Sequence, residues 1–369
     1  MVVASAIAVN LSTPYAMDFI SYWAAGKLAL AGDPAAAWDI ARHHAVQVGA
    51  VAEPTIMPFP YPPPYLFAVT LFALLPFPWA AAAWIAATLA FYLFAVRRFA
   101  LGLTPLAIAF PPVMVCGIVG QNAFLLAGLF VLAMALLPSR PVVAGVLIGL
   151  LAVKPQLGLL IPLALIAGRE WRAFAAAAAA VAATAFASLI IFGWPSWQGF
   201  VDLIPLYGRI AEQGLVGWHK MASVYAALRL TGLTHVVALG VHLIVLAVAA
   251  LTMWRVWRVS SDPLLRGAAL AVASVLISPY LYVYDQLLLI LALAWALRAG
   301  VSQAVLAGLC VIPLICLALI AFPSIPLTPA PLLPIALLAL LWPYAWGSGA
   351  RSGATNPRRA ATENNSSAL

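Results

Sequence analysis

Charged side chains are scarce in this sequence: they make up 8% of its 369 residues, and only ten of them are acidic. A soluble globular domain carries about 25% charged residues, so the composition excludes one. Long apolar runs recur along the chain and predict a polytopic, all-α membrane protein. The strands of a membrane β-barrel alternate in polarity, and these continuous runs exclude that fold as well.

Cysteine is also rare. Cys116, Cys310 and Cys316 lie in apolar segments without ligand spacing, which favours small core residues over a metal site or a disulfide. The sequence has no glycine-rich phosphate loop, no Cys/His cluster and no nucleophile elbow, so nothing supports nucleotide binding and we expect no cofactor. The net charge of +8 comes from basic residues scattered between apolar runs. Membrane topology explains that scatter better than nucleic-acid binding does.

The apolar runs predict about 11 to 13 transmembrane helices in one domain over 1–346. Residues 1–11 are shorter than the ~20 residues that a span needs, and no basic region precedes them as in a signal peptide, so we expect a clipped first span. The tail 347–369 is rich in Ser, Asn and Arg and is expected to be disordered and cytoplasmic. The other candidate spans are 79–96, 104–119, 122–137, 141–153, 156–168, 173–192, 234–254, 267–281, 285–298, 303–322 and 330–346.

The short apolar piece 65–77 decides the predicted topology. If it is interfacial or re-entrant, twelve of the eighteen basic residues fall in short loops on one side, which marks the cytoplasmic side. If it spans the membrane, arginine clusters appear on both faces. The residues that share the cytoplasmic side are Arg97, Arg98, Arg140, Arg169, Arg172, Arg255, Arg258, Arg266, Arg298, Arg351, Arg358 and Arg359.

The extracytoplasmic face then collects the polar segments. The first loop, 12–64, is expected to carry amphipathic helices over 19–30 and 35–50, and the second long loop covers 193–233. The same side holds three further polar segments, which are Gly120-Gln121-Asn122, Lys154-Pro155-Gln156 and the stretch from Ser278 to Gln286. Their shared side predicts one extracytoplasmic site, with short flanking helices lining a cavity.

Asp18 is the leading candidate for chemistry. It follows a short apolar run and stands among Tyr15, Phe19, Tyr22 and Trp23. An ionisable group at a membrane surface is costly and is a functional candidate by default. The structural alternative is that Asp18 caps the N-terminus of the helix over 19–30.

Each of the other polar residues also has a structural alternative. Lys154 interrupts two apolar half-helices and either binds a phosphate as a point charge or snorkels to the interface. Asp285 either binds a sugar hydroxyl or an incoming basic partner, or forms a structural ion pair or helix cap. Gln121 and Asn122 have amides that suit carbohydrate hydroxyls, although a tight turn also uses them. His219 lies in a loop rich in Trp and Gly, where a surface histidine is usually inert.

Taken in order, these motifs resemble glycosyltransferase family 87. The resemblance covers roughly residues 15–300, and its members include polyprenol-phosphate-mannose-dependent α-1,2-mannosyltransferases of the GT-C superfamily. The motifs that carry it are Asp18-Phe19, Tyr61-Pro62-Pro63, Gly120-Gln121-Asn122, Lys154-Pro155, and Ser278-Pro279 followed by Tyr284-Asp285.

The resemblance implies an all-helical GT-C fold in a bacterial cytoplasmic membrane, with a catalytic Asp in the first extracytoplasmic loop. Such an enzyme moves a hexose, with mannose as the first expectation, from a polyprenyl-phosphate donor to a lipid or glycan acceptor in glycolipid biosynthesis. Asp18 would be the general base. The donor phosphate would lie near Lys154, His219, Lys220 and Arg209, and no metal is required. The expected sugar and acceptor residues are Tyr22, Tyr61, Gln121, Asn122, Gln156, Tyr284 and Asp285.

Two other classes of membrane protein have similar features. A transporter or lipid-linked sugar flippase also has broken helices and polar groups at a cavity. Against it, the sequence shows no internal repeat, and the polar segments lie at one face rather than the midplane. A structural membrane subunit would not need so many polar residues on one face.

Overall fold

The computed structural model describes residues 17–51, 56–215, 217–320, 322 and 324–347. The expected clipped span over 1–11, Tyr15 and nearly all of the expected tail lie outside these residues. Within the described ranges the chain is helical and contains no strand, only one isolated antiparallel bridge between Met221 and Tyr282.

Three helices in the described part of the chain are long and apolar enough to cross a membrane unaided. They belong to α5 (Phe77–Phe99), α12 (Trp171–Glu212) and α14 (His235–Val259). At 1.5 Å per residue, the 23 residues of α5 extend about 35 Å, which matches a bilayer core. With the shorter apolar helices around them, they make the chain a polytopic all-α membrane protein, as the sequence predicts.

The remaining spans are shorter helices, and prolines at their first turns mark where several begin. The predicted span 104–119 is divided at Phe110-Pro111 into α6 (Thr104–Ala109) and α7 (Pro112–Val119). The span 156–168 is divided into α10 (Pro155–Gly158) and α11 (Ile161–Ala167). The other elements are α8 (Ala123–Leu136), α9 (Pro141–Leu150), η4 (Leu151–Val153), α13 (Val224–Leu230), α15 (Pro263–Leu276), η6 (Val283–Leu289), α16 (Ile290–Arg298), α17 (Gln303–Ile320) and α18 (Leu332–Trp346).

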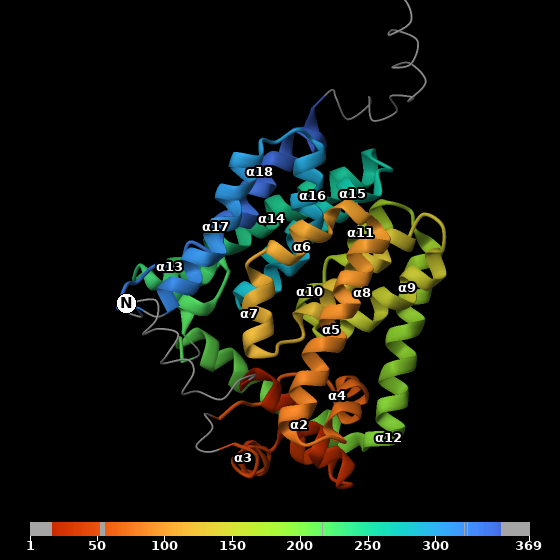
Figure 1. The fold of residues 1–369 in the computed structure, drawn as a ribbon, viewed down its shortest axis with the longest axis vertical. Helices are drawn as coiled ribbons and strands as arrows, with labels where there is room; N and C mark the ends of the chain where they lie inside the picture. Colours follow the sequence, from red (N-terminus) through yellow and green to blue (C-terminus); the bar gives the residue numbers. More distant parts are fainter. Residues whose placement is uncertain (1–16, 52–55, 216, 321, 323, 348–369) are drawn as a thin grey trace, which may run out of the picture.

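The first loop folds into helices at one end of the molecule. Figure 1 shows α2 (Met17–Leu30), α3 (Ile40–Val48) and α4 (Leu66–Ala73) together there, and α6, α15 and α18 toward the other end. The helix expected over 35–50 is two pieces, because Asp39 accepts hydrogen bonds from the first amides of α3 and so starts a new helix after η1 (Pro34–Trp38). With eight residues, α4 extends about 12 Å, too short to span.

Helix α2 is buried on most of its surface, more fully than a helix at a membrane interface needs to be. It packs against α4, η1 and α3. The approach to α4 is close at Gly26, where a Cβ would lie 2.6 Å from the Ala73 Cβ and 2.8 Å from the Val69 carbonyl oxygen. The packing around this glycine holds the second half of α2 against α4, which fixes the helix that carries Asp18 at its first turn.

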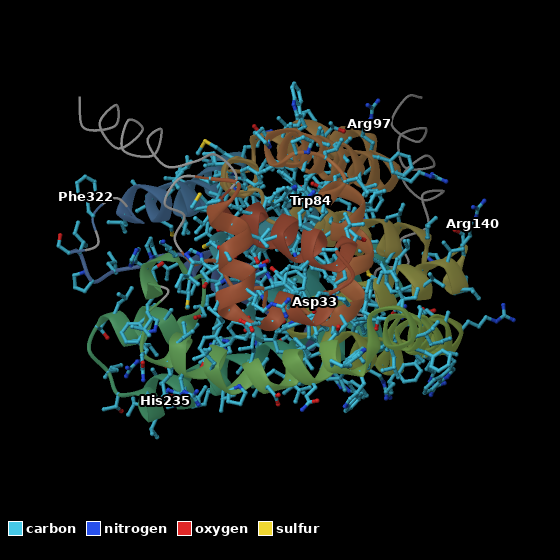
Figure 2. All side chains as sticks on the ribbon, turned by 90° about the horizontal axis from the view of Figure 1, so that it is seen from below. Asp33, Trp84, Arg97, Arg140, His235 and Phe322 are labelled. Carbon is cyan, nitrogen blue, oxygen red and sulfur yellow. The ribbon has the colours of Figure 1, made fainter. Side chains whose placement is uncertain are left out.

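The second long loop is largely helical. Helix α12 continues past its predicted end at residue 192, although Gly193 breaks its regular backbone with φ 76° and ψ 164°, a conformation suited to glycine. Residues 217–233 then form η5 (Trp218–Lys220) and α13 before α14 begins. Seen from the end that holds α2 to α4, Asp33 lies in front, while Arg97 and Arg140 point outward at the rim (Figure 2).

Candidate active site

Asp18 lies in the first turn of α2 and is half-buried. Its Oδ2 accepts a hydrogen bond of 3.1 Å from the Nε2 amide of Gln121, 103 residues further along the chain. Burial raises the pKa of the Asp18 carboxyl, while the Gln121 hydrogen bond and the charges of Lys220 and Lys154 lower it. Asp18 therefore lies close to three of the other predicted site residues, and its described side-chain hydrogen bond is tertiary rather than a cap of α2.

The Gln121 side chain also contacts two tyrosines. Its Oε1 accepts from the hydroxyl of Tyr22 and, at 3.1 Å, from the backbone amide of Asn122. The Tyr61 hydroxyl lies 2.9 Å from the Tyr22 hydroxyl and 3.4 Å from Oε1. Burial raises the pKa of both phenols, so both hydroxyls keep their protons. Three predicted site residues, Gln121, Tyr22 and Tyr61, thus form one network with the Asp18 carboxylate.

The turn before α8 fixes this network to the protein. Gly120 ends α7 in the left-handed conformation, with φ 72°, which glycine adopts without strain. Its carbonyl accepts a 3.0 Å hydrogen bond from the Trp84 indole on α5, and the Cys116 thiol lies 3.3 Å from the Gln121 carbonyl oxygen. The local sequence Gly-Gln-Asn thus makes a sharp helix-to-helix turn that presents the Gln121 side chain to α2.

Asn122 lies beside this network with its polar atoms unused. It is fully buried, and in the described part of the chain its amide nitrogen and oxygen have no hydrogen-bond partner, nor has the Tyr65 hydroxyl. The phenols of Tyr61 and Tyr65 lie next to the amide without hydrogen-bond geometry. Buried polar groups are normally satisfied, so this pair is unusual among the buried groups near Asp18.

Lys154 and Asp285 form a buried ion pair. Lys154 Nζ lies 2.6 Å from Asp285 Oδ1, and the two side chains are 6% and 0% exposed. Lys154 therefore does not snorkel to the interface. The second carboxylate oxygen of Asp285 accepts from the Tyr282 amide at 3.2 Å, so the structural alternative for Asp285, an ion pair and a helix cap, is present. The pair joins two helix breaks, one before α10 and one at the start of η6.

Tyr282 and Tyr284 form a wall beside the ion pair. Their rings stack with centroids 5.3 Å apart, and Lys154 Nζ lies 5.3 Å from the centre of the Tyr284 ring. Burial raises the pKa of these two phenols, and the charges of Asp18 and Asp285 both raise it further, so both carboxylates lie near the wall. Tyr282 was not a predicted site residue. The signal was present, since tyrosines at 280, 282 and 284 alternate as in an extended strand, where every second side chain shares a face.

The segment around residue 221 is bound to this wall by its backbone. Met221 pairs with Tyr282, and the Ala222 amide donates to the Leu281 carbonyl at 2.6 Å. This pairing carries Lys220 to the site, where it is exposed and its charge acts on Asp18. His219 is half-buried, and burial together with Lys220 lowers its pKa, so we expect a neutral imidazole there.

Two predicted site residues in the described part of the chain are not hydrogen-bonded to the polar residues around Asp18 and Lys154. Gln156 is half-buried on α10, and Arg209 is exposed near the end of α12. Within the described ranges no hydrogen bond or ion pair connects either side chain to the Asp18 network or to Lys154. His43 is buried and joins α3 to α2 through a 3.0 Å contact with the Ser21 carbonyl.

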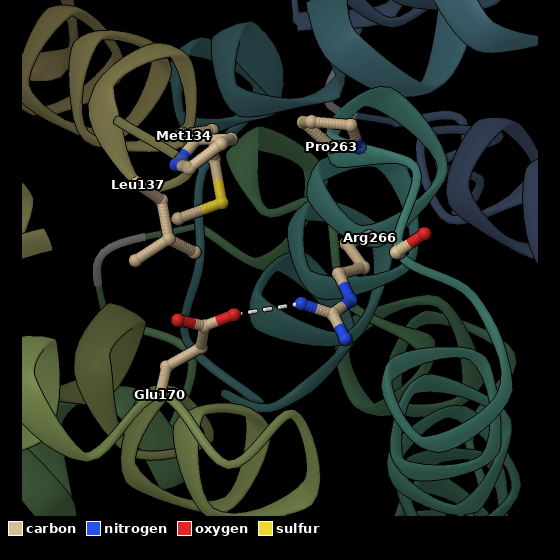
Figure 3. A pocket seen from close by; sticks show the side chains of 7 residues that line it. Met134, Leu137, Glu170, Pro263 and Arg266 are labelled. Atoms are coloured by element: carbon tan, nitrogen blue, oxygen red, sulfur yellow. Dashed lines mark hydrogen bonds and ion pairs between the residues drawn. The ribbon is translucent and has the colours of Figure 1, made fainter. Parts of the chain in front are cut away.

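A metal site and the pocket at the opposite end of the molecule would be alternative functional sites. Among the described residues no group of three His, Cys, Asp or Glu side chains lies close enough to hold a metal ion. A pocket of about 190 Å³ lies between the ends of α8 and α15 (Figure 3), where Glu170 faces Arg266 at 2.9 Å. The Arg266 guanidinium also donates to the Ser260 and Trp257 carbonyls, so its donors serve the protein itself.

A larger apolar groove begins beside Lys154. It has a volume of about 480 Å³, and Pro155, the residue after Lys154, is part of its lining together with Gly158. The rest of the lining comes from α9, α11 and α12 together with Ala152 and Leu159, and consists of apolar side chains and glycine. A groove of this kind suits a hydrocarbon chain.

Comparison with known proteins gives one match. The model of glycosyltransferase family 87 matches residues 59–279, more than half of the chain. The match contains Tyr61, Gln121, Lys154 and the segment that bears Lys220, and it begins after Asp18. No curated protein and no solved structure matches the chain.

Proposed function

Since the chain belongs to glycosyltransferase family 87, we propose that it moves a hexose, mannose in the first instance, from a polyprenyl-phosphate donor to a lipid or glycan acceptor. The reaction takes place on the extracytoplasmic face of a bacterial cytoplasmic membrane. Family membership favours a transferase over a transporter or flippase.

The observation that carries the mechanism is the half-buried Asp18 carboxylate, with one oxygen held by Gln121 and two lysines close by. Asp18 acts as the general base. It removes the proton from the acceptor hydroxyl as that oxygen bonds to the anomeric carbon, and the bond from this carbon to the phosphate oxygen breaks. A single displacement of this kind inverts the anomeric centre. For proton transfer the acceptor oxygen must come within about 2.6–3.2 Å of the carboxylate.

The leaving polyprenyl phosphate needs positive charge near its oxygens. Lys220 supplies it in this proposal, because its side chain is exposed and its charge reaches Asp18. Lys154 contributes from inside the protein, although Asp285 already neutralises much of its charge. His219, neutral at physiological pH, contributes a hydrogen bond and not a charge. Fixed charges that face the leaving group are often the largest single term in catalysis.

The polyprenyl chain occupies the apolar groove beside Pro155 in this proposal. Pro155, the residue after Lys154, lines the groove. A lipid whose phosphate lies near the lysines therefore has its first isoprene units in the groove. The donor chain enters the groove from the bilayer and not from water, so the groove contributes packing contacts and orientation rather than a transfer free energy.

The test uses purified protein and a synthetic polyprenyl-phosphate mannose, with mass spectrometry of the product lipid or glycan. Asp18→Asn keeps an oxygen that can accept from Gln121 but removes the base, so we expect a folded protein that is about 10²- to 10⁴-fold slower. Asp202→Asn makes the same change at an exposed position and serves as the matched control. Wild-type turnover by a correctly folded Asp18→Asn protein would contradict the proposal.

A further inference from the structure

The hydrogen bonds around Gln121 have a defined direction. A tyrosine hydroxyl carries one proton, and that of Tyr22 goes to Gln121 Oε1. The 2.9 Å contact between the two phenols is then a donation from Tyr61 to Tyr22, a shorter contact than the 3.4 Å from the same Tyr61 hydroxyl to Oε1. Oε1 also accepts from the Asn122 amide, so the oxygen of the side-chain amide faces the tyrosines and its NH₂ faces Asp18.

This direction determines what Gln121 can do. Its oxygen is occupied by two donors, and one of its two N–H groups is committed to Asp18 Oδ2. A turned amide would point its oxygen at the carboxylate and its NH₂ at the Tyr22 hydroxyl, and would lose these bonds. Because the backbone of the turn is held by Trp84 and Cys116, the whole side chain has little freedom to move away.

We propose that Gln121 is a positioning residue, the last member of a donor chain from Tyr61 through Tyr22 that holds Asp18 Oδ2 and leaves Oδ1 for the acceptor hydroxyl. This inference rests on the proposed function, since it assigns Asp18 the role of base. It also revises the expectation that Gln121 binds sugar. A hydrogen bond to an ionised group is shorter and stronger than a neutral one, and a chain of such bonds strengthens each member.

The chain also keeps the base ionised. Burial raises the pKa of Asp18 and the Gln121 donor lowers it, so removal of the donor shifts this pKa upward. Asp18 works as a base only when deprotonated, so the acid limb of the pH–rate profile then moves to higher pH. Five other titratable groups interact electrostatically with Asp18, namely Lys154, Lys220, Tyr61, Tyr282 and Tyr284. The Gln121 substitutions described below leave all five in place.

The experiment compares pH–rate profiles of kcat/KM for wild type and Gln121→Glu. The substituted carboxylate still accepts from Tyr22 and Asn122, so the turn is kept, but when ionised it has no N–H for Asp18 and it adds a like charge beside it. Gln121→Met removes the N–H without adding a charge and so isolates the loss of the donor. We expect the acid limb to move up by about one to two pH units in Gln121→Met and further in Gln121→Glu, and activity to recover above the new limb. A variant that is only misfolded does not recover with pH. Gln303→Glu, the same change at an exposed position on α17, should leave the profile unchanged.

Two tyrosine variants test the direction of the chain. Tyr22→Phe removes the donor to Gln121 and should shift the limb less than Gln121→Glu, and Tyr61→Phe should shift it least, because the Tyr22 donation remains. An unshifted limb in Gln121→Met, together with inactive Asp18→Asn, overturns the inference and leaves the proposed function standing. Active Asp18→Asn overturns the proposed function itself, so the two failures are distinct.

Discussion

The buried ion pair between Lys154 and Asp285 allows a quantitative prediction. Replacing Lys154 by Met leaves the Asp285 carboxylate with no exposed surface and no cation at 2.6 Å. Breaking a buried pair in this way costs about 3–5 kcal/mol. Asp285 retains its hydrogen bond from the Tyr282 amide, which offsets part of the loss, so we expect a value at the lower end, about 3 kcal/mol.

The double variant Lys154→Met/Asp285→Asn removes both charges. Since replacing a buried pair by neutral groups is often close to neutral in stability, it should recover most of the loss. The side-chain amide oxygen introduced at position 285 would still accept from the Tyr282 backbone amide. The control is Arg298→Met, which breaks an exposed pair with Asp262 and should cost at most about 1 kcal/mol.

The assay is thermal unfolding in detergent, followed by the fluorescence of the protein's thirteen tryptophans, alongside donor saturation curves. If Lys154 also binds the donor phosphate, the stable double variant still uses the donor poorly, while Lys154→Arg keeps the charge and more of the activity. The reasoning is refuted if Lys154→Met melts like the wild type. If the double variant has a wild-type KM for the donor, Lys154 does not bind the phosphate.

Two further predictions concern the groove and the topology. Gly158 faces open space, so Gly158→Phe should fill the groove and raise the KM for a long-chain donor more than for a short-chain one. Gly240→Phe, also in open space but on α14, is the control and should not change either KM. If Gly158→Phe changes the KM equally for both chain lengths, the groove does not bind the donor chain. In a background with Cys310 replaced by Ser, a membrane-impermeant thiol reagent should label Ala31→Cys from outside the cell and Ser139→Cys only after lysis. Labelling of both from outside would place the two positions on one side, contradict the predicted arrangement and make 65–77 a true span.

The helices could be predicted well because the signals for them are local. Apolar length locates α5 and α14, and prolines such as Pro141 and Pro263 mark the first turns of α9 and α15. Local signals are less decisive inside an apolar run. The division at Phe110-Pro111 was missed because Pro is tolerated within membrane helices, where neighbours can satisfy the freed backbone groups.

The pairings within the site could not be predicted, because they join distant parts of the chain. The Gly-Gln-Asn turn and the Asp18 position stand out in the sequence, yet nothing local indicates that Gln121 donates to Asp18 across 103 residues. In the same way, Lys154 and Asp285 each signalled a site, but their partnership across 131 residues is a result of packing. The sequence motifs therefore identify which residues belong to the site. The role of each residue depends on its contacts, which only the structure provides.

The backbone pairing of Met221 with Tyr282 has a consequence for assembly. The paired residues flank α14 and α15, so they meet only after both helices have been inserted and have returned the chain to the same side. The Ser223 hydroxyl and the Pro279 carbonyl close the same junction at 2.5 Å. Lys220 lies beside Met221, and Asp285 bonds to the Tyr282 amide. Insertion of the helical hairpin α14–α15 is therefore required before these polar residues can come together.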